Sequence, residues 1–243
     1  MPVVALHRDA PQRQEGMTAA PTYESLAGIV NHTLLEPELT NAQVVDGLEV
    51  AKRYGVATVT VRACDADLGV RMVQGSPVTA GSIVSYPYGF QSTAVKLYEA
   101  RDLLRRGARD IGVVVGTSKL LSREFQQVQT ELNQIVESCR GAAARLTVYL
   151  EASLLTDEQK IIACTCCERA EVDFVSTAGG YTVPDLKLLR KHLPDETGIQ
   201  VSGVSTLGEA LELQAVGVSR IATASTVEIL SEWKRRLTPP SAT

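Results

Sequence analysis

The stretch "VDFVSTAGGYTVPDLKLL", residues 172–189, decides the fold and raises the question of function. Its first six residues form a short run rich in β-branched and aromatic side chains, which is typical of a buried strand. A glycine-containing loop and an amphipathic helical segment follow. This strand–loop–helix order is one unit of a parallel β/α structure.

The same unit recurs along the chain. β-rich runs occupy residues 28–35, 57–63, 79–86, 110–116, 146–152, 172–177, 199–203 and 220–225. Helical segments follow them at about residues 40–54, 66–74, 92–106, 122–140, 155–170, 183–193, 206–216 and 225–236. Eight alternating units without a central break predict an α/β fold of the (β/α)8 TIM-barrel type, with its active site at the C-terminal ends of the strands.

The length of the chain agrees with one barrel, and its charge and hydropathy argue against nucleic acid and membranes as partners. The 243 residues suit a TIM barrel of about 250 residues. We expect the barrel over residues 23–240, after a flexible polar extension of residues 1–22. A net charge of −4 gives no reason to expect nucleic acid. The sequence shows neither an apolar run near the ~20 residues of a membrane span nor a secretory signal, so we expect a cytoplasmic protein.

Five cysteines, an odd number, favour free thiols in a reducing compartment. Three of them lie in "CTCC", residues 164–167, which invites a metal-site interpretation. Adjacent helical residues point about 100° apart, so we expect these thiols to pack a helix against the sheet instead. No metal and no cofactor are expected. At residues 206–209, Thr206 and Glu209 have the spacing of a helix capping box.

Several motifs resemble one enzyme family, the deoxyribose-phosphate aldolases. They are "VNHTLLEPELT" (30–40), "SYPYGFQSTAVKLYEA" (85–100), "LEASLLTDEQ" (150–159), "VDFVSTAGGYTVPDLKLLR" (172–190) and "VSGVSTLGEALELQAVGVSRIATAS" (201–225). They occur in the family's order from about residue 26 to 230. The resemblance implies an aldolase-type barrel, and it also suggests a homodimer.

The resemblance fails where the family does its chemistry. The family reacts through a Schiff base on a sixth-strand lysine, because the iminium accepts electrons from the developing carbanion. By motif match this position is Ser176, and the second lysine of the family falls on Gln200. The family's acidic positions fall on Gly112 and Asn31. All four changes together predict a neutral site, which is less costly than a partial loss that leaves unpaired buried charges.

The lysines of this chain offer few candidates to replace the family's Schiff-base lysine. Lys52, Lys96, Lys160, Lys187, Lys191 and Lys234 fall in helical stretches, where we expect solvated surface charges. Lys119 follows the fourth strand, so it is the candidate for a relocated Schiff base. The family's phosphate-binding glycine loops are also altered, although Gly203 and Ser225 remain.

Other side chains at predicted strand ends could bind or transform a ligand. Glu151 and Tyr86 are the candidates for general base and acid, beside Ser176, Asn31 and Gln200. A structural role for the glutamate remains open. His32 should point towards the helices and be structural. The expected ligand-binding residues are Thr33, Arg62, Cys64, Tyr88, Lys119, Thr177, Tyr181, Ser202, Gly203 and Ser225.

Three functions remain open at this point. The first is a cofactor-independent lyase, cyclase or isomerase, including one of specialised metabolism, that acts on a small carbonyl compound by acid–base and hydrogen-bond catalysis. The second is a non-catalytic barrel that binds a ligand or a protein partner. The third is a true aldolase that uses Lys119.

Overall fold

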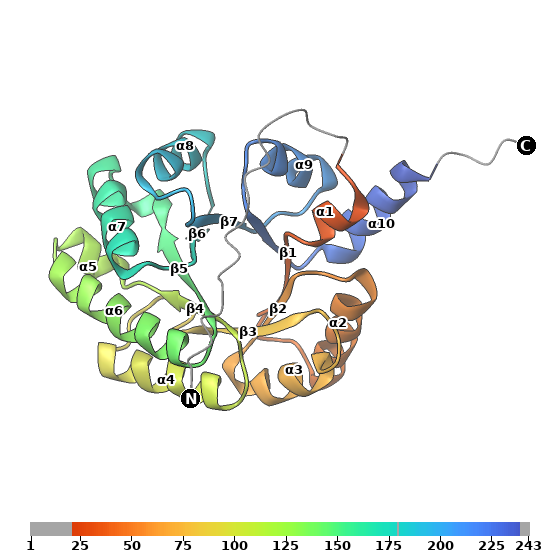
Figure 1. Cartoon of the computed structure of the whole chain (residues 1–243), viewed down its shortest axis with the longest axis horizontal. Helices are drawn as coiled ribbons and strands as arrows, with labels where there is room; N and C mark the ends of the chain where they lie inside the picture. The colour runs from red at the N-terminus through yellow and green to blue at the C-terminus, as the bar shows by residue number, and fades with distance from the viewer. Residues whose placement is uncertain (1–20, 179, 239–243) are drawn as a thin grey trace, which may run out of the picture.

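Eight parallel strands close into a barrel in sequence order, from β1 to β8 and back to β1 (Figure 1). The computed structural model describes residues 21–178 and 180–238. The TIM-barrel prediction is confirmed, and each strand lies within a few residues of its predicted run. The strands are β1 (Val30–Leu34), β2 (Thr58–Val61), β3 (Thr79–Val84), β4 (Asp110–Val114), β5 (Arg145–Glu151), β6 (Phe174–Ala178), β7 (Gly198–Ser202) and β8 (Arg220–Thr223).

Helices surround the barrel (Figure 1). The long ones match the predicted segments: α2 (Asn41–Tyr54), α3 (Ala66–Val73), α4 (Thr93–Arg105), α6 (Phe125–Gly141), α7 (Asp157–Ala170), α8 (Val183–His192), α9 (Leu207–Ala215) and α10 (Thr226–Leu237). Two five-residue helices, α1 (Tyr23–Ala27) and α5 (Thr117–Leu121), were not predicted, because they are too short to show a helical period. Nearly all of the predicted extension, residues 1–20, lies outside the described residues.

Strand alternation sorts side chains into two cores. Outward-facing residues such as Val59, Val148 and Val175 pack under the helices in one continuous apolar cluster. Inward-facing residues fill the barrel itself. Ser176 faces inward, so its neighbour Thr177 faces the helices, fully buried. The predicted ligand-binding role of Thr177 is therefore wrong, since the side chain lies on the other side of the strand.

A buried ion pair closes the end of the barrel interior at which the strands begin. Arg220 donates two hydrogen bonds to Asp110, at 3.0 and 2.9 Å. Its guanidinium also lies 3.8 Å from the centre of the Phe174 ring. These contacts satisfy the buried charges and leave the opposite, C-terminal end of the barrel for the site.

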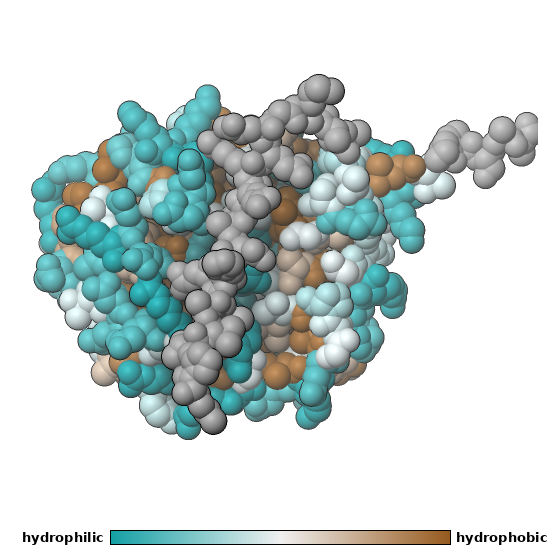
Figure 2. Space-filling view, viewed as in Figure 1, coloured by the Kyte–Doolittle hydropathy of each residue, from teal (hydrophilic) through white to brown (hydrophobic). Residues whose placement is uncertain are grey.

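Figure 2 shows a visible face on which hydrophilic side chains predominate at the left, whereas apolar ones are more frequent at the right. Over the described residues, no helix is long and apolar enough to cross a membrane.

Two arginines that share Asp110 provide a matched test of this closure. Arg220 is almost fully buried, whereas the side chain of Arg145 is 45% exposed and its Nε lies 3.6 Å from the same carboxylate. Arg220→Met should lower the free energy of unfolding by about 3–5 kcal/mol, because it leaves Asp110 buried without its main partner. Arg145→Met should cost less than about 1 kcal/mol. Equal losses in urea unfolding would contradict this assignment.

Candidate active site at the barrel mouth

A chain of neutral hydrogen bonds crosses the middle of the barrel. Gln200 donates from Nε2 to the Ser176 hydroxyl at 3.0 Å and to the Tyr149 hydroxyl at 2.9 Å. Its oxygen accepts from Asn31 Nδ2 at 3.4 Å, and Asn31 accepts from Thr60 at 2.8 Å. The amide of Gln200 thus joins four strands through uncharged groups.

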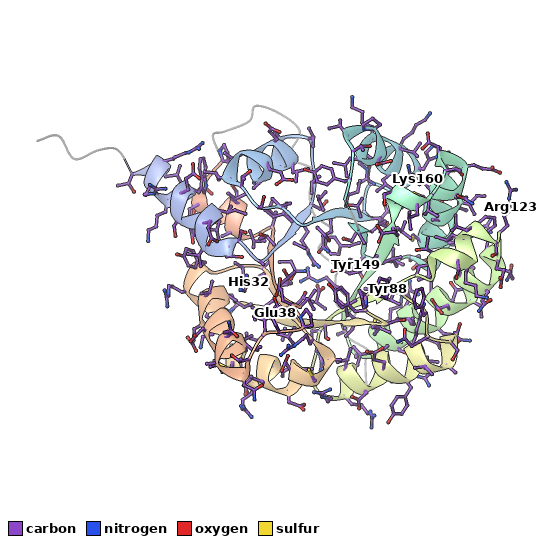
Figure 3. The ribbon with its side chains drawn as sticks, turned by 180° about the vertical axis from the view of Figure 1, so that it is seen from behind. His32, Glu38, Tyr88, Arg123, Tyr149 and Lys160 are labelled. Carbon is purple, nitrogen blue, oxygen red and sulfur yellow. The ribbon has the colours of Figure 1, made fainter. Side chains whose placement is uncertain are left out.

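Tyr149 was missed by the sequence analysis, although it lies near the centre of the barrel in Figure 3. Alternation from Glu151 along β5 could have found it, because residues two apart face the same side. Its ring fills the space beside Gly112: a Cβ added to that glycine would lie 2.7 Å from Tyr149 Cε2. Burial raises the pKa of Tyr149 to about 12, so its phenol stays protonated near neutral pH.

Three predicted catalytic residues form the floor of the site. Asn31, Ser176 and Gln200 have at most 1% of their surface exposed. The Ser176 hydroxyl bonds that of Ser202 at 3.0 Å, and Ser202 is partly exposed at the end of β7. Thr33 is also partly exposed, two residues above Asn31 on β1. A ligand at this end of the barrel would therefore contact Thr33 and Ser202 before these buried residues.

The acid–base candidates lie at the rim. Glu151 ends β5, is partly exposed and accepts a hydrogen bond from Ser153 at 3.2 Å. Tyr86 follows β3 and is 48% exposed. Burial of part of its ring, and then the nearby Glu36 carboxylate, raise the pKa of Tyr86. Glu36, in the loop after β1, is a second carboxylate near the mouth that the sequence analysis did not single out.

The Arg62 side chain is held by hydrogen bonds within the protein. Its Nε donates to Asp65 at 2.6 Å, and its Nη1 donates to the carbonyls of Glu36 and Pro37. The side chain therefore joins the loop after β1 to the start of α3, which leaves less of it for the predicted ligand. Cys64 is exposed beside Asp65, with 3.6 Å between the sulfur and the carboxylate.

Aromatic side chains gather on the loop after β3. Tyr88 is 65% exposed, and its ring stacks on that of Phe90 with 5.2 Å between centroids. Across the mouth, Tyr181 follows β6 and donates to Glu209 at 2.8 Å. Gly203, in the loop after β7, has a φ of +84°, which glycine adopts without strain.

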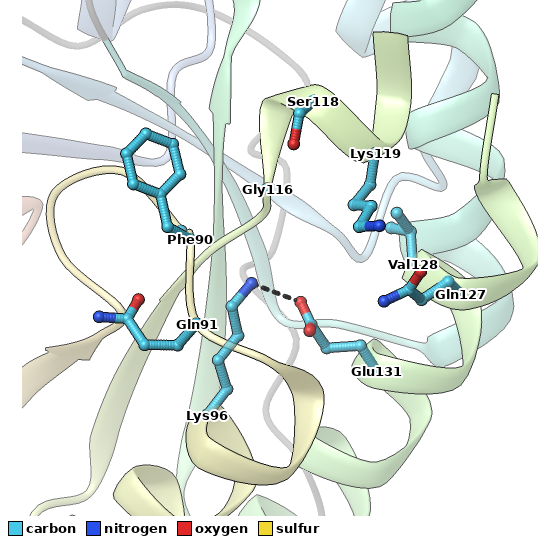
Figure 4. A pocket seen from close by; sticks show the side chains of 10 residues that line it. Phe90, Gln91, Lys96, Gly116, Ser118, Lys119, Gln127, Val128 and Glu131 are labelled. Atoms are coloured by element: carbon cyan, nitrogen blue, oxygen red, sulfur yellow. Dashed lines mark hydrogen bonds and ion pairs between the residues drawn. The ribbon is translucent and has the colours of Figure 1, made fainter. Parts of the chain in front are cut away.

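Lysines are absent from all eight described strands. Lys119 lies on α5 and lines a cavity of about 90 Å³ (Figure 4). Its amine pairs with Glu124 at 2.9 Å. The same cavity borders Lys96, which is 1% exposed, donates to the Val114 carbonyl and pairs with Glu131 at 2.7 Å. The cavity lies between the loop after β3, α4, the start of α5 and α6.

Two lysines expected at the surface are buried. Besides Lys96, Lys160 is 8% exposed and pairs with Asp185 at 2.6 Å between α7 and α8. The prediction of solvated charges was wrong for both, because carboxylates of neighbouring helices face them. Hydrogen bonding to Asp185 raises the pKa of Lys160.

The remaining predictions concern thiols, His32 and metals. Cys164, Cys166 and Cys167 are buried and free, and burial raises the pKa of each, as expected of packing residues. His32 faces the helices and bonds Thr226 at 2.9 Å, which agrees with its structural role. Among the described residues, no three His, Cys, Asp or Glu side chains are grouped as metal ligands.

The closed barrel of eight parallel strands, with its polar C-terminal end, defines the class as a TIM barrel. The chain is 32% identical over 219 residues to the deoxyribose-phosphate aldolase of Caldanaerobacter subterraneus subsp. tengcongensis, covering 87% of this chain and 95% of the relative. It is also 32% identical over 230 residues to that of Rhodopirellula baltica, covering 90% and 93%. The chain therefore belongs to the deoxyribose-phosphate aldolase family, as its motifs predicted.

A solved structure of the same family has a similar fold. The tetrameric deoxyribose-phosphate aldolase from Aeropyrum pernix superposes with a TM-score of 0.80 at 26% identity, covering 89% of this chain and 94% of that one. No protein-family model matches the chain.

The close fit of Tyr149 against Gly112 can be tested by stability. Gly112→Ala should lower the free energy of unfolding by about 1–3 kcal/mol, because the added methyl overlaps the Tyr149 ring. Most of this loss should disappear in a Tyr149→Leu background, as a double-mutant cycle would show. Gly208→Ala is the control, since nothing lies within 4 Å of the added methyl. Equal losses in both backgrounds would exclude the steric explanation.

Proposed function

We propose that this protein is an enzyme of the aldolase fold that works without a Schiff base. The single observation that carries the proposal is the neutral Gln200 network, with Ser176 at the motif position of the family's lysine. A serine hydroxyl cannot form an iminium, and a fully hydrogen-bonded amide needs no counter-charge. The chemistry left to the site is polarisation of a carbonyl group and proton transfer.

The exposed residues have complementary roles in this proposal. Glu151 acts as the general base that removes a proton next to the carbonyl of a small substrate. Tyr86, whose raised pKa keeps it protonated, donates a hydrogen bond or a proton to the carbonyl oxygen. Ser202, held by Ser176, positions the substrate. Enolisation of this kind serves a lyase, a cyclase or an isomerase, including enzymes of specialised metabolism.

Two alternatives have less support. A true aldolase that uses Lys119 needs an amine over the barrel mouth, but this amine lies on α5 and pairs with Glu124. A non-catalytic barrel that binds a ligand or a partner protein is compatible with the same network.

We also propose that this protein is a cytoplasmic homodimer and that it requires no cofactor. The Aeropyrum pernix relative, by contrast, is a tetramer.

Exchange of α-protons in heavy water tests the proposed chemistry without knowledge of the substrate. A set of small unphosphorylated aldehydes and ketones, followed by NMR, should include at least one compound whose α-protons exchange faster with the protein than in buffer. Glu151→Gln should reduce this rate about 100-fold or more, because it removes the general base. Glu38→Gln is the control, since Glu38 is an exposed carboxylate in the loop after β1.

The alternatives make different predictions for the same measurement. Exchange that survives Glu151→Gln unchanged would remove Glu151 from the mechanism. No exchange with any compound, together with thermal stabilisation by one of them, would favour the non-catalytic binding barrel.

A further inference from the structure

One side of the barrel mouth is apolar. Ile83, Val114 and the ring of Tyr149 form a small cluster of their own, separate from the large apolar cluster under the helices. Val114 ends β4 and Ile83 is the residue before the end of β3, so the cluster lies near the C-terminal ends of the strands. Leu35, after β1, and Ala178, at the end of β6, are partly exposed and pack against it. A ligand at the β3–β4 side of the mouth would therefore contact apolar surface.

The opposite side of the mouth carries hydroxyl groups. Ser202 at the end of β7 and Ser225 after β8 are both partly exposed. Because the eight strands close in sequence order, β7 and β8 lie across the barrel from β3 and β4. The two sides thus suit a ligand with a polar end and an apolar end.

Exposed aromatic rings extend the apolar side outwards. Three of the eleven aromatic residues of the chain, Tyr86, Tyr88 and Phe90, lie within five residues directly after β3, and all three are exposed. Burial is the main cause of the raised pKa values of Tyr86 and Tyr149. A smaller Coulombic contribution comes from Tyr88 to the first and from Tyr86 to the second. The three phenols therefore lie near one another, from the barrel interior to its rim. A group of exposed apolar rings beside a cleft is typical of a binding surface.

The loop that carries these rings is held in a strained conformation. Ser85 has a φ of +61°, which is uncommon for a residue other than glycine. Its N–H donates to Glu99 Oε2 on α4 at 2.9 Å, its carbonyl accepts from Gly89 N at 2.8 Å, and its hydroxyl donates to Gln91. Strain of this kind collects at ligand sites. A loop that is already ordered loses little conformational entropy when a ligand binds to it.

We infer that the β3–β4 side of the mouth is an aromatic subsite, and that the substrate is a carbonyl compound that carries an aromatic ring. This inference rests on the proposed function and names its substrate class. The ring of the substrate lies against Ile83 and Val114 and stacks on Tyr88. Its carbonyl group then lies within the mouth, where Tyr86 donates to the oxygen. Offset or edge-to-face contacts between aromatic rings favour such a ligand over an aliphatic one.

Binding of three methyl ketones, followed by ligand-observed NMR, tests the inference. The natural chain should bind 4-phenylbutan-2-one about tenfold or more tightly than butan-2-one, because the phenyl ring adds apolar surface to bury. It should bind 4-cyclohexylbutan-2-one less tightly than the phenyl compound, because the saturated ring cannot stack. Tyr88→Ala should weaken binding of the phenyl compound about three- to tenfold, whereas Tyr88→Phe keeps the ring and the affinity. Tyr98→Ala is the matched control, since Tyr98 is an equally exposed tyrosine on α4.

Several outcomes would overturn the aromatic subsite. They are equal affinity for the phenyl and the cyclohexyl or unsubstituted ketone, no binding of any of the three, and equal losses in Tyr88→Ala and Tyr98→Ala. Sedimentation of the natural chain and Tyr88→Ala should give the same subunit number. A change in that number would assign the exposed rings to a subunit interface instead. Binding is measured without turnover, so its failure leaves the proton-exchange chemistry standing, whereas a lack of exchange leaves the binding result intact.

Discussion

The polar interior of this barrel depends on the side-chain amide of Gln200. Both of its N–H groups are used, one on Tyr149 and one on Ser176, and its oxygen accepts from Asn31. A buried polar group without a hydrogen-bond partner lowers the stability of a protein by about 1–3 kcal/mol. The hydrogen bonds of this amide therefore restrain both Gln200 and the side chains that it contacts. A charge introduced at any of these positions would disturb all of them.

Under the proposed function, this constraint accounts for the whole set of differences that the motif match implies. A lysine at Ser176 would need a carboxylate nearby, but Gly112 supplies none and the Tyr149 ring occupies the space beside it. The polar groups that remain are neutral and mutually satisfied. The ionisable groups lie at the rim instead, where Glu151, Glu36 and Tyr86 have contact with solvent. In the proposed mechanism, the floor positions the substrate and the rim transfers the proton.

The fold was predictable because short β-rich runs alternate eight times with longer helical segments, several of which begin with a capping residue. The floor residues Asn31, Ser176 and Gln200 were found by motif register alone, but their complete burial was not apparent. Tyr149 could have been found by alternation along β5. Pairs that join distant segments could not be found this way: Glu131 lies 35 residues from Lys96, and Tyr181 lies 28 residues from Glu209.

The central claim, that the site works without a Schiff base, is tested most directly by borohydride trapping with acetaldehyde. The treated protein is read by intact mass and then by peptide mapping, beside a deoxyribose-phosphate aldolase that has its lysine. We expect no adduct on this protein and a stoichiometric adduct on the control. A stoichiometric adduct on Lys119, or on any other lysine of this chain, would contradict the account and restore an aldolase mechanism.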